Sequence, residues 1–420
     1  MRAVIMAGGL GARMAGLFPG LPKPLIPVGG KPVLTRQIET LVRQGITEIT
    51  LVTGYLADRI EAVFGDGSTL GAQIAYYKEE TPLGTAGALY RMDFDGDFLL
   101  LSGDLVFDFD VWAMLAFHKE KGALATLFAH PNAHPADSTL IDADAARILR
   151  RFLPKEDRAG YYENLANAGV QILSPALLSM YPHTGRADLD RDLLRPAAAT
   201  GRVYVYRSYE YVRDMGTPDR LSAVERDLAS GLVAAKNKAH PQRAVFLDRD
   251  GTLNAPNGFI TTPDALTLLP GAARAVKKIN ESGFLAVLVT NQPVIARGEC
   301  TEETLKVIHN KLETLLGAEG AYLDAIYYCP HHPDAGYPGE VKALKIPCDC
   351  RKPAPGMLLR AAREMHIDLA ASYMVGDSWR DVKTAENAGC TPVFLGPALP
   401  EGSPANTLLF PDLKAFADTL

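Results

Sequence analysis

Apolar residues are gathered along this chain in short runs that alternate with segments of helical spacing. The runs at residues 3–6, 49–54, 98–104, 244–248 and 285–291 have the pattern of strands, and several of them are apolar at every position. Strands that are apolar on both faces are typical of a parallel sheet covered on both sides. Residues 32–44, 272–281 and 301–316 repeat their apolar positions with helical spacing. The alternation predicts an α/β fold.

A strand followed by a glycine-containing loop occurs twice, at residues 3–11 and at residues 244–251. The two loops differ in their chemistry, so they are not copies of one repeat. With 420 residues the chain is also too long for one ordinary core. Residues 234–243 are polar, contain a proline and precede the second of these strands. We therefore predict two domains, at residues 1–235 and 241–420.

Composition and charge narrow the class of protein. Hydrophobic residues make up 47% of the chain and charged residues 22%, the balance of a soluble globular protein. The net charge of -6 argues against a general nucleic-acid binder. No apolar stretch approaches the roughly 20 residues of a membrane helix, and the first apolar run is too short for a secretion signal. We expect a cytoplasmic protein without a nucleic-acid or membrane partner; the sequence leaves open whether it forms a homo-oligomer.

The second glycine-containing loop begins with two carboxylates. Asp248 ends an apolar strand and is followed by Arg249, Asp250, Gly251 and Thr252. A carboxylate at a strand tip can attack phosphorus in line, and one placed two residues later can protonate the leaving alkoxide and then activate water. Gly251 lets the backbone turn close to the phosphate. Taken alone, this pattern also fits a simple turn or a calcium loop.

Three later features favour phosphoryl chemistry. Thr290 ends another buried strand with a hydroxyl that can bind a phosphoryl oxygen. Arg351 and Lys352 offer cations to the charge on a transferring phosphate. Asp377, with Asp381 following, places carboxylates suited to Mg2+ at the tip of a fourth strand.

In this order the four elements resemble the haloacid dehalogenase superfamily of phosphatases, over residues 243–397. The resemblance implies a parallel sheet and a set of functional residues: Asp248 as nucleophile, Asp250 as acid and base, Thr290 and Lys352 as phosphate-binding residues, and Asn291 and Arg351 as substrate contacts. It also implies Mg2+ held by Asp248, the Asp250 carbonyl and Asp377.

Cysteine and histidine residues cluster in one short region of the same half. Cys329 and His331, followed by Cys348 and Cys350, supply four soft ligands for a closed tetrahedral Zn2+ site. His332 is an alternative to His331, and a loop of reduced thiols is the alternative to a metal site. An odd total of five cysteines with local clustering favours the metal over a disulfide framework. Four protein ligands leave no open position, so we expect a structural zinc ion.

This cluster, together with residues 290–292 and 295–298, resembles the subfamily of phosphatases that removes the 7-phosphate from D-glycero-D-manno-heptose 1,7-bisphosphate. Histidinol-phosphate phosphatases share the framework and are the closest alternative. In both, a metal-bound loop replaces a bulky cap domain, and the short interval between Asp250 and Thr290 leaves little room for a large cap. Pro293 and Val294 stand where heptose phosphatases usually carry Ser-Gly, which is a departure in the substrate loop.

The first glycine-containing loop has different chemistry. Gly8, Gly9 and Gly11 allow the backbone to approach a nucleotide closely, and Arg13 and Lys23 supply the charge that a triphosphate requires. A methionine stands at the third glycine of a dinucleotide-binding loop, and no Gly-Lys-Ser/Thr sequence closes a Walker A loop.

Gly-Gly-x-Gly-x-Arg together with Pro-Lys-Pro resembles the sugar-1-phosphate nucleotidyltransferases, which implies a Rossmann-like mixed sheet. Further elements follow in that family's order, and the resemblance implies their roles: nucleotide contacts at Gly84 and Thr85, in a segment 82–88 that opens a helix; Mg2+ at Asp104 and Asp214; sugar contacts at Asn167 and Gly169; and a sugar-phosphate contact at Lys155. Pro154 stands in place of the family's glutamate, and Glu163 can replace that carboxylate only if its loop folds back.

The two halves fit consecutive steps. Removal of a 7-phosphate leaves a heptose 1-phosphate, whose oxygen can attack the α-phosphorus of a nucleoside triphosphate and release pyrophosphate, with catalysis by positioning and charge neutralisation. The resemblance implies a heptose 1-phosphate guanylyltransferase that uses GTP and forms GDP-D-glycero-α-D-manno-heptose. Two alternatives stay open: a nucleotide-sugar-binding module without turnover, and a phosphatase for histidinol phosphate or another sugar phosphate.

Overall fold

The computed structural model describes residues 1–420 with the exception of Leu10, Ala12 and Tyr337. Its contacts divide the chain into two compact units. Unit 1 comprises Met1–Ala129, Ile141–Phe152 and Asn167–Asn237, and unit 2 comprises His130–Leu140, Leu153–Ala166 and Lys238–Leu420. Two segments of the N-terminal half therefore group with the C-terminal residues.

Unit 1 is built on a mixed sheet. Among the described residues nine strands form it, in the order β10-β9-β11-β6-β1-β4-β5, with β8 paired to β11 and β12 paired to β8. These strands are β1 (Ala3–Met6), β4 (Glu48–Thr53), β5 (Gln73–Lys78), β6 (Phe98–Ser102), β8 (Ala125–His130), β9 (Leu140–Ala143), β10 (Leu149–Leu153), β11 (Ala166–Leu173) and β12 (Val203–Arg207). β1 runs parallel to β4 and β6, whereas β11 is antiparallel to β6. The predicted mixed sheet is confirmed.

Helices and two short strand pairs complete unit 1. The helices are α1 (Val33–Arg43), α2 (Ala57–Phe64), α3 (Val111–Glu120), α4 (Pro175–Met180), α5 (Arg195–Ala198), α6 (Pro218–Ala229) and α7 (Leu232–Ala235). The antiparallel pairs are β2 (Pro27–Val28) with β3 (Lys31–Pro32), and β7 (Leu105–Asp108) with β13 (Tyr211–Asp214). In α1, Leu34, Ile38 and Leu41 are buried because their spacing of four and three residues puts them on one face.

Unit 2 contains a parallel sheet, as predicted. Its order within the described chain is β16-β15-β14-β17-β18-β19, and the strands are β14 (Ala244–Leu247), β15 (Leu285–Asn291), β16 (Ala325–Cys329), β17 (Tyr373–Gly376), β18 (Thr391–Leu395) and β19 (Leu408–Phe410). Its helices are α8 (Ala272–Glu281), α9 (Glu302–Ala318), α10 (Gly356–Met365), α11 (Trp379–Ala388) and α12 (Leu413–Ala417).

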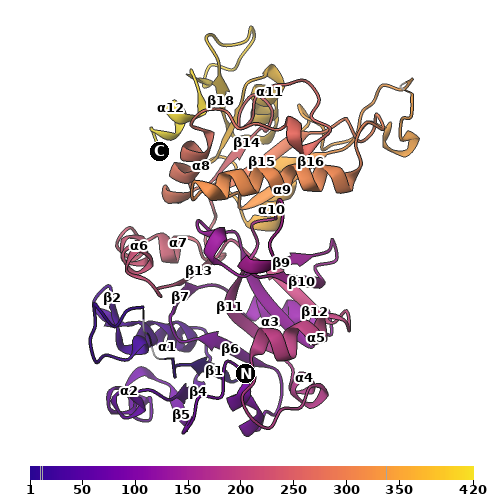
Figure 1. The fold of residues 1–420 in the computed structure, drawn as a ribbon. Coiled ribbons are helices and arrows are strands. Elements are labelled where there is room, and N and C mark those ends of the chain that lie inside the picture. The colour runs from indigo at the N-terminus through magenta and orange to yellow at the C-terminus, as the bar shows by residue number, and fades with distance from the viewer. Residues whose placement is uncertain (10, 12, 337) are drawn as a thin grey trace. The chain divides into compact units, whose positions relative to one another are not determined.

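The core of unit 2 shows why its central strands are apolar on both faces. Val245 and Leu247 of β14 and Leu288 of β15 point to one side, into a cluster with buried residues of α8, α9 and α12. Phe246, which points to the other side, is also fully buried. Figure 1 shows α9 running across the strands of this sheet. An apolar side chain makes no hydrogen bonds to water, so it loses none when either face of the sheet is covered. Apolar residues are therefore favoured on both faces of these strands.

The segment 82–88, which was expected to open a helix, turns and enters the 3-10 helix η3 (Gly87–Arg91). Gly84 has a φ of +81°, and a Cβ atom there would lie 2.4 Å from Ala187 O. The backbone is therefore bent closely against another segment, in a conformation that an α-helix does not contain.

Within the described residues no helix has both the length and the apolar character to cross a bilayer.

Candidate active sites

Three predicted residues of unit 2 meet where parallel strands end. Asp248 follows β14, Thr290 lies near the end of β15, and Asp377 follows β17. The registers of β14 with β15 and with β17 bring the carboxyl ends of these strands to one edge of the sheet. This edge is the usual ligand-binding side of an open α/β fold.

The ammonium group of Lys352 lies between two carboxylates at this edge. Lys352 Nζ is 2.9 Å from Asp248 Oδ1 and 2.6 Å from Asp381 Oδ1, and 3% of its side chain is exposed. Burial alone would lower the pKa of Lys352, but the two carboxylates raise it. Burial raises the pKa of Asp248 to about 7, and the charge of Lys352 opposes that shift. A cation at this place favours the carboxylate form of Asp248, the form that can attack phosphorus.

Asn291 fixes the backbone beside this ammonium group. Asn291 Nδ2 donates to Lys352 O at 3.1 Å, and Lys352 N donates to Asn291 Oδ1 at 3.0 Å. Arg351 Nη1 donates to His331 O at 3.2 Å, so the neighbouring cation is tied to the cysteine-containing loop. The structure thus gives Asn291 and Arg351 positioning contacts, and their contact with a substrate stays a prediction.

Asp250, the predicted acid and base, accepts hydrogen bonds from three side chains. Arg249 Nη2 is 3.0 Å from Asp250 Oδ2, Asn254 Nδ2 is 3.0 Å from Oδ1, and Gln292 Nε2 is 3.2 Å from Oδ2. Gln292 Nε2 also donates to Thr290 Oγ1 at 3.0 Å. The amide of Gln292 therefore connects the acid and base residue with the predicted phosphate-binding hydroxyl.

Carboxylates at the same edge fit a divalent cation. Oxygens of Asp248, Asp377 and Asp381 lie within 4.8 Å of one another, and all three are hard ligands of the kind that Mg2+ prefers. Burial raises the pKa of Asp377, and the charge of Asp381 raises it further. Gly251 has a φ of +81°, and a Cβ atom there would lie 1.9 Å from Asp377 Oδ2. Asp381 was grouped in the sequence with carboxylates suited to Mg2+ but was absent from the ligand set that the resemblance implied; it lies in the first turn of α11.

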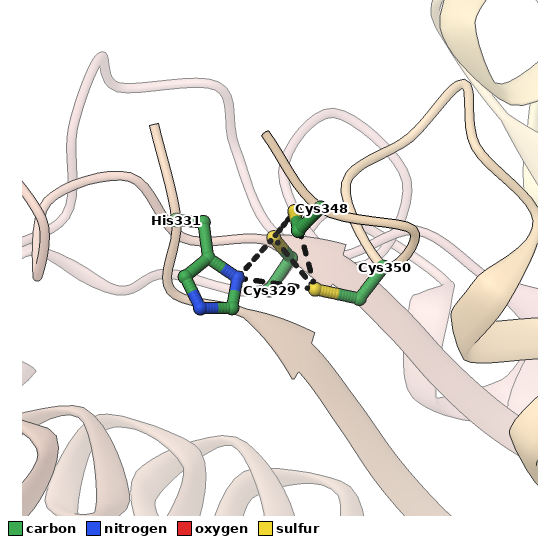
Figure 2. A group of neighbouring side chains, drawn as sticks. All are labelled: Cys329, His331, Cys348 and Cys350. Carbon is green, nitrogen blue, oxygen red and sulfur yellow. Dashed lines mark hydrogen bonds between the residues drawn. The ribbon is translucent and has the colours of Figure 1, made fainter. Parts of the chain in front are cut away.

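Figure 2 shows Cys329, His331, Cys348 and Cys350 directed at one another. The distances between their sulfur atoms are 3.2, 3.5 and 3.6 Å, and His331 Nδ1 lies 3.3 Å from Cys350 Sγ. Zinc–sulfur bonds of about 2.3 Å in a tetrahedron place sulfur atoms about 3.8 Å apart. The four atoms fit a closed zinc site, and no disulfide joins the thiols. His332 Nδ1 instead accepts a backbone N–H at 3.1 Å.

A pocket of about 650 Å3 lies in unit 1 at the carboxyl ends of β1 and β6. Predicted nucleotide-binding residues line it: Gly8, Gly9, Lys23, Gly84 and Thr85, with the predicted metal ligand Asp104. A Cβ atom on Gly8 would lie 3.3 Å from Gly54 N, so the loop passes close to the next strand end. Gly11 has a φ of +62°, and its neighbours Leu10 and Ala12 lie outside the described residues.

The two carboxylates predicted to hold Mg2+ in unit 1 come from paired strands. Leu105, which follows Asp104, is opposite Asp214 in the antiparallel pair of β7 and β13. Lys23 Nζ donates to Asp104 Oδ2, and Arg220 Nη1 lies 2.9 and 3.0 Å from the two carboxylate oxygens of Asp214. Each predicted metal ligand therefore has a basic side chain beside it.

Gly216 shows how closely these groups gather. A Cβ atom on Gly216 would lie 2.9 Å from Asp214 Oδ1, 3.1 Å from Lys23 Nζ and 3.5 Å from Arg13 Nη2. The predicted cations and a predicted metal ligand thus surround one residue that has no side chain. Two carboxylates flanked by cations fit Mg2+ and a triphosphate, since carboxylates bind the metal and basic groups bind phosphate oxygens.

A second cavity of unit 1, about 180 Å3 in volume, contains the predicted sugar contacts Asn167 and Gly169 together with Asp188 and Asp190. Asn167 Nδ2 lies 3.5 Å from Asp190 Oδ1. Burial raises the pKa of Asp190 to about 6, and the charge of Asp188 contributes to the shift. Neither aspartate was predicted, because no sequence motif shows that this part of the chain folds back beside β11.

Lys155, the predicted sugar-phosphate contact, belongs to a segment that groups with unit 2. It begins the 3-10 helix η5 (Lys155–Asp157) within Leu153–Ala166, a segment of unit 2, and its Nζ is 3.6 Å from Asp137 Oδ1. The predicted alternative carboxylate, Glu163, belongs to the same segment. The contact of Lys155 with a sugar phosphate stays a prediction.

Glu79 is a further pocket residue that the sequence did not reveal. It lines the 650 Å3 pocket just after β5, and burial raises the pKa of its carboxyl group. Its Oε1 has no hydrogen-bond partner among the described residues. Nothing in the sequence distinguishes Glu79 from the neighbouring Glu80, which is exposed. Both residues line the pocket, and only the fold shows that Glu79 is the more buried of the two.

Comparison with known proteins matches both units. The nucleotidyl transferase family model matches residues 2–231, and the HAD-hydrolase-like model matches residues 349–396. D-glycero-beta-D-manno-heptose-1,7-bisphosphate 7-phosphatase of Yersinia pestis is 47% identical over 142 residues, which cover 34% of this chain and 73% of that protein. The crystal structure of D,D-heptose 1,7-bisphosphate phosphatase of B. bronchiseptica is 37% identical and covers 42% of this chain and 97% of that chain, with a TM-score of 0.38. The crystal structure of HddC of Yersinia pseudotuberculosis is 25% identical and covers 54% of this chain and 99% of that chain, with a TM-score of 0.48.

We expect removal of zinc to destabilise unit 2, because the ion would join two distant segments through four ligands. The variant Cys348→Ser should lose about one zinc ion per chain, and calorimetry should show its unfolding transition at least about 5 °C lower. The variant Cys390→Ala, which removes a buried thiol outside the cluster, should keep its zinc. Unchanged melting of protein shown to be metal-free would contradict a structural role.

Proposed function

We propose that this chain catalyses two consecutive steps, one in each unit. The chain belongs to the nucleotidyl transferase family through residues 2–231. It belongs to the D-glycero-beta-D-manno-heptose-1,7-bisphosphate 7-phosphatase family through its C-terminal part. Unit 2 removes the 7-phosphate of heptose 1,7-bisphosphate, and unit 1 transfers a guanylyl group from GTP to the resulting heptose 1-phosphate. The observation that carries the proposal is the pairing on one chain of a phosphate site at Asp248 and Lys352 with a nucleotide-sized pocket at Lys23 and Asp104.

The phosphatase step follows from the arrangement in unit 2. Asp248 attacks phosphorus, the bond to the sugar oxygen breaks, and Asp250 gives that oxygen a proton. Water then attacks the aspartyl phosphate, Asp250 accepts the proton of the water, and Asp248 is released. Lys352, next to Asp248 and fully enclosed, balances charge on the transferring group. Mg2+ held by Asp248 and Asp377 would add charge neutralisation for the phosphoryl oxygens.

The transfer step needs charge compensation more than proton transfer. Both reactants are anions, and the sugar phosphate is already ionised, so no general base is required. Arg13 and Lys23 can bind triphosphate oxygens, and Asp104 and Asp214 would hold Mg2+. Arg220, which now occupies both oxygens of Asp214, would have to yield at least one of them to a metal. Asp188 and Asp190 are acceptors at the place predicted for the sugar hydroxyls.

Guanine is favoured by the carboxyl group of Glu79. The Watson–Crick edge of guanine offers two adjacent donors, N1–H and N2–H, whereas the other bases offer only one donor group beside an acceptor. A carboxylate accepts two hydrogen bonds from such an edge. Glu79 is a partly buried carboxyl group of the pocket with an unpartnered oxygen, so a paired donor edge would satisfy it.

The two activities should be separable by single substitutions. Asp248→Asn should abolish phosphate release from heptose 1,7-bisphosphate while the chain still releases pyrophosphate from heptose 1-phosphate and GTP. Asp104→Asn should do the reverse. Both anomers should be assayed, because the relatives are named for the beta form, and histidinol phosphate serves as the competing substrate. Faster hydrolysis of histidinol phosphate, or no pyrophosphate with any of the four nucleoside triphosphates, would contradict the proposal.

The base preference gives a separate prediction. Glu79→Gln keeps the shape of the side chain but replaces an acceptor with a donor, so kcat/KM for GTP should fall about 10-fold to 100-fold. The rate with UTP should change much less. Glu120→Gln, at an exposed residue of α3 that does not line the pocket, is the control and should behave as wild type. An equal loss with GTP and UTP would show that Glu79 does not distinguish the base.

A further inference from the structure

We propose that Arg249 is the positioning residue that holds Asp250 for its two proton transfers. The inference rests on the proposed phosphatase function and assigns a role to the residue between the two aspartates. Arg249 Nε and Nη2 lie 3.2 and 3.1 Å from Asp250 Oδ1, and Nη2 lies 3.0 Å from Oδ2. A guanidinium group that meets a carboxylate at three donor–acceptor distances fixes both its location and its plane.

Two further side chains donate to Asp250, and together with Arg249 they form what we call the cradle. Asn254 Nδ2 donates to Oδ1 and Gln292 Nε2 donates to Oδ2, at 3.0 and 3.2 Å. The donors come from three places: the loop after β14, the turn that closes it, and the residue after β15. Backbone bonds of Leu253 N and Asn254 N to Arg249 O, at 2.9 and 3.0 Å, hold the turn closed. Asp250 therefore has little rotational freedom while the cradle is intact.

The surroundings of Arg249 direct its charge toward Asp250. The side chain of Arg249 is 1% exposed, and a buried cation is costly unless a carboxylate pairs with it. His309 of α9 lies near enough for the charge to matter: burial lowers the pKa of His309 to about 3, and Arg249 adds to the effect. Arg249 Nη1 is buried and has no hydrogen-bond partner among the described residues.

The position of Asp250 matters differently for different leaving groups. When the bond from phosphorus to an alkoxide oxygen breaks, that oxygen must receive the Asp250 proton as Asp248 forms its bond to phosphorus. A nitrophenolate is stable without the proton, so its departure does not depend on Asp250. Loss of the cradle should therefore slow the first step with alkyl phosphates and largely spare it with aryl phosphates. Misfolding or loss of the phosphate site would slow both.

The test compares single-turnover rates of the full-length chain with heptose 1,7-bisphosphate and with p-nitrophenyl phosphate. Arg249→Met should reduce the first-turnover rate about 100-fold with the sugar phosphate and less than about 10-fold with the aryl phosphate, with KM values close to wild type. Arg249→Lys, which keeps one cationic donor, should recover part of the sugar-phosphate rate. Arg274→Met, at an exposed arginine of α8, is the control for loss of a charge.

Zinc content and pyrophosphate release should be unchanged in every variant, which establishes that both units are folded. If Arg249→Met does not fold, Arg249→Lys alone must show the unequal loss between the two substrates. Equal losses, or no loss with either substrate, would overturn the positioning role. If the wild-type chain hydrolyses p-nitrophenyl phosphate but not the heptose bisphosphate, the proposed substrate fails; the same comparison with another primary alkyl phosphate that it does hydrolyse still decides the role of Arg249.

Discussion

The ammonium group of Lys352 lies 2.9 Å from Asp248 and 2.6 Å from Asp381 in a place that water hardly reaches. Without it, the carboxylates that gather at this strand edge would repel one another, and burial would favour their protonated forms. The rest of the site depends on keeping this cation in position. Asn291 holds its backbone, and Arg351 connects the same stretch of chain to the loop of the cysteine cluster.

Unit 1 meets the same constraint with different residues. Asp104 and Asp214 also come together at strand ends, and Lys23 and Arg220 lie beside them. In unit 2 parallel strands bring the carboxylates to one edge, whereas in unit 1 the antiparallel pair of β7 and β13 brings Asp214 beside the residue that follows Asp104. In both units basic side chains from elsewhere in the chain balance the carboxylates. Phosphate chemistry requires both signs of charge, because the metal is bound by carboxylates and the substrate by cations.

Much of this could be predicted from local patterns. The strand at 285–291 and the helix at 272–281 are found with the predicted bounds, because a continuous apolar run and a regular helical spacing are local signals. Asp248, Thr290, Lys352 and the four residues of the cysteine cluster are brought together as their motifs indicated. Asp248, Thr290 and Cys329 lie at or next to strand ends, so the order of the strands brings them to one edge. Cys348, Cys350 and Lys352 lie in the loop before α10, and their motifs alone indicated their place.

The remaining features depend on contacts between distant segments. Gly84 bends against Ala187, so the helix that this segment opens begins only at Gly87 and is a 3-10 helix. Glu79 differs from Glu80, which lines the same pocket, in being partly buried, and Asp190 is partly buried because its segment folds beside β11. The segment of Lys155 groups with unit 2 although it lies in the N-terminal half of the sequence. Neither periodicity nor spacing contains this information.

Gly251 also limits how unit 2 can evolve. One added methyl group there would lie 1.9 Å from Asp377 Oδ2, so even the smallest replacement would displace a carboxylate of the catalytic edge. The positive φ of Gly251 adds a second obstacle, because an L side chain is strained there. The proposed phosphatase chemistry thus depends on the absence of a side chain at Gly251 as much as on the presence of the carboxylates around it.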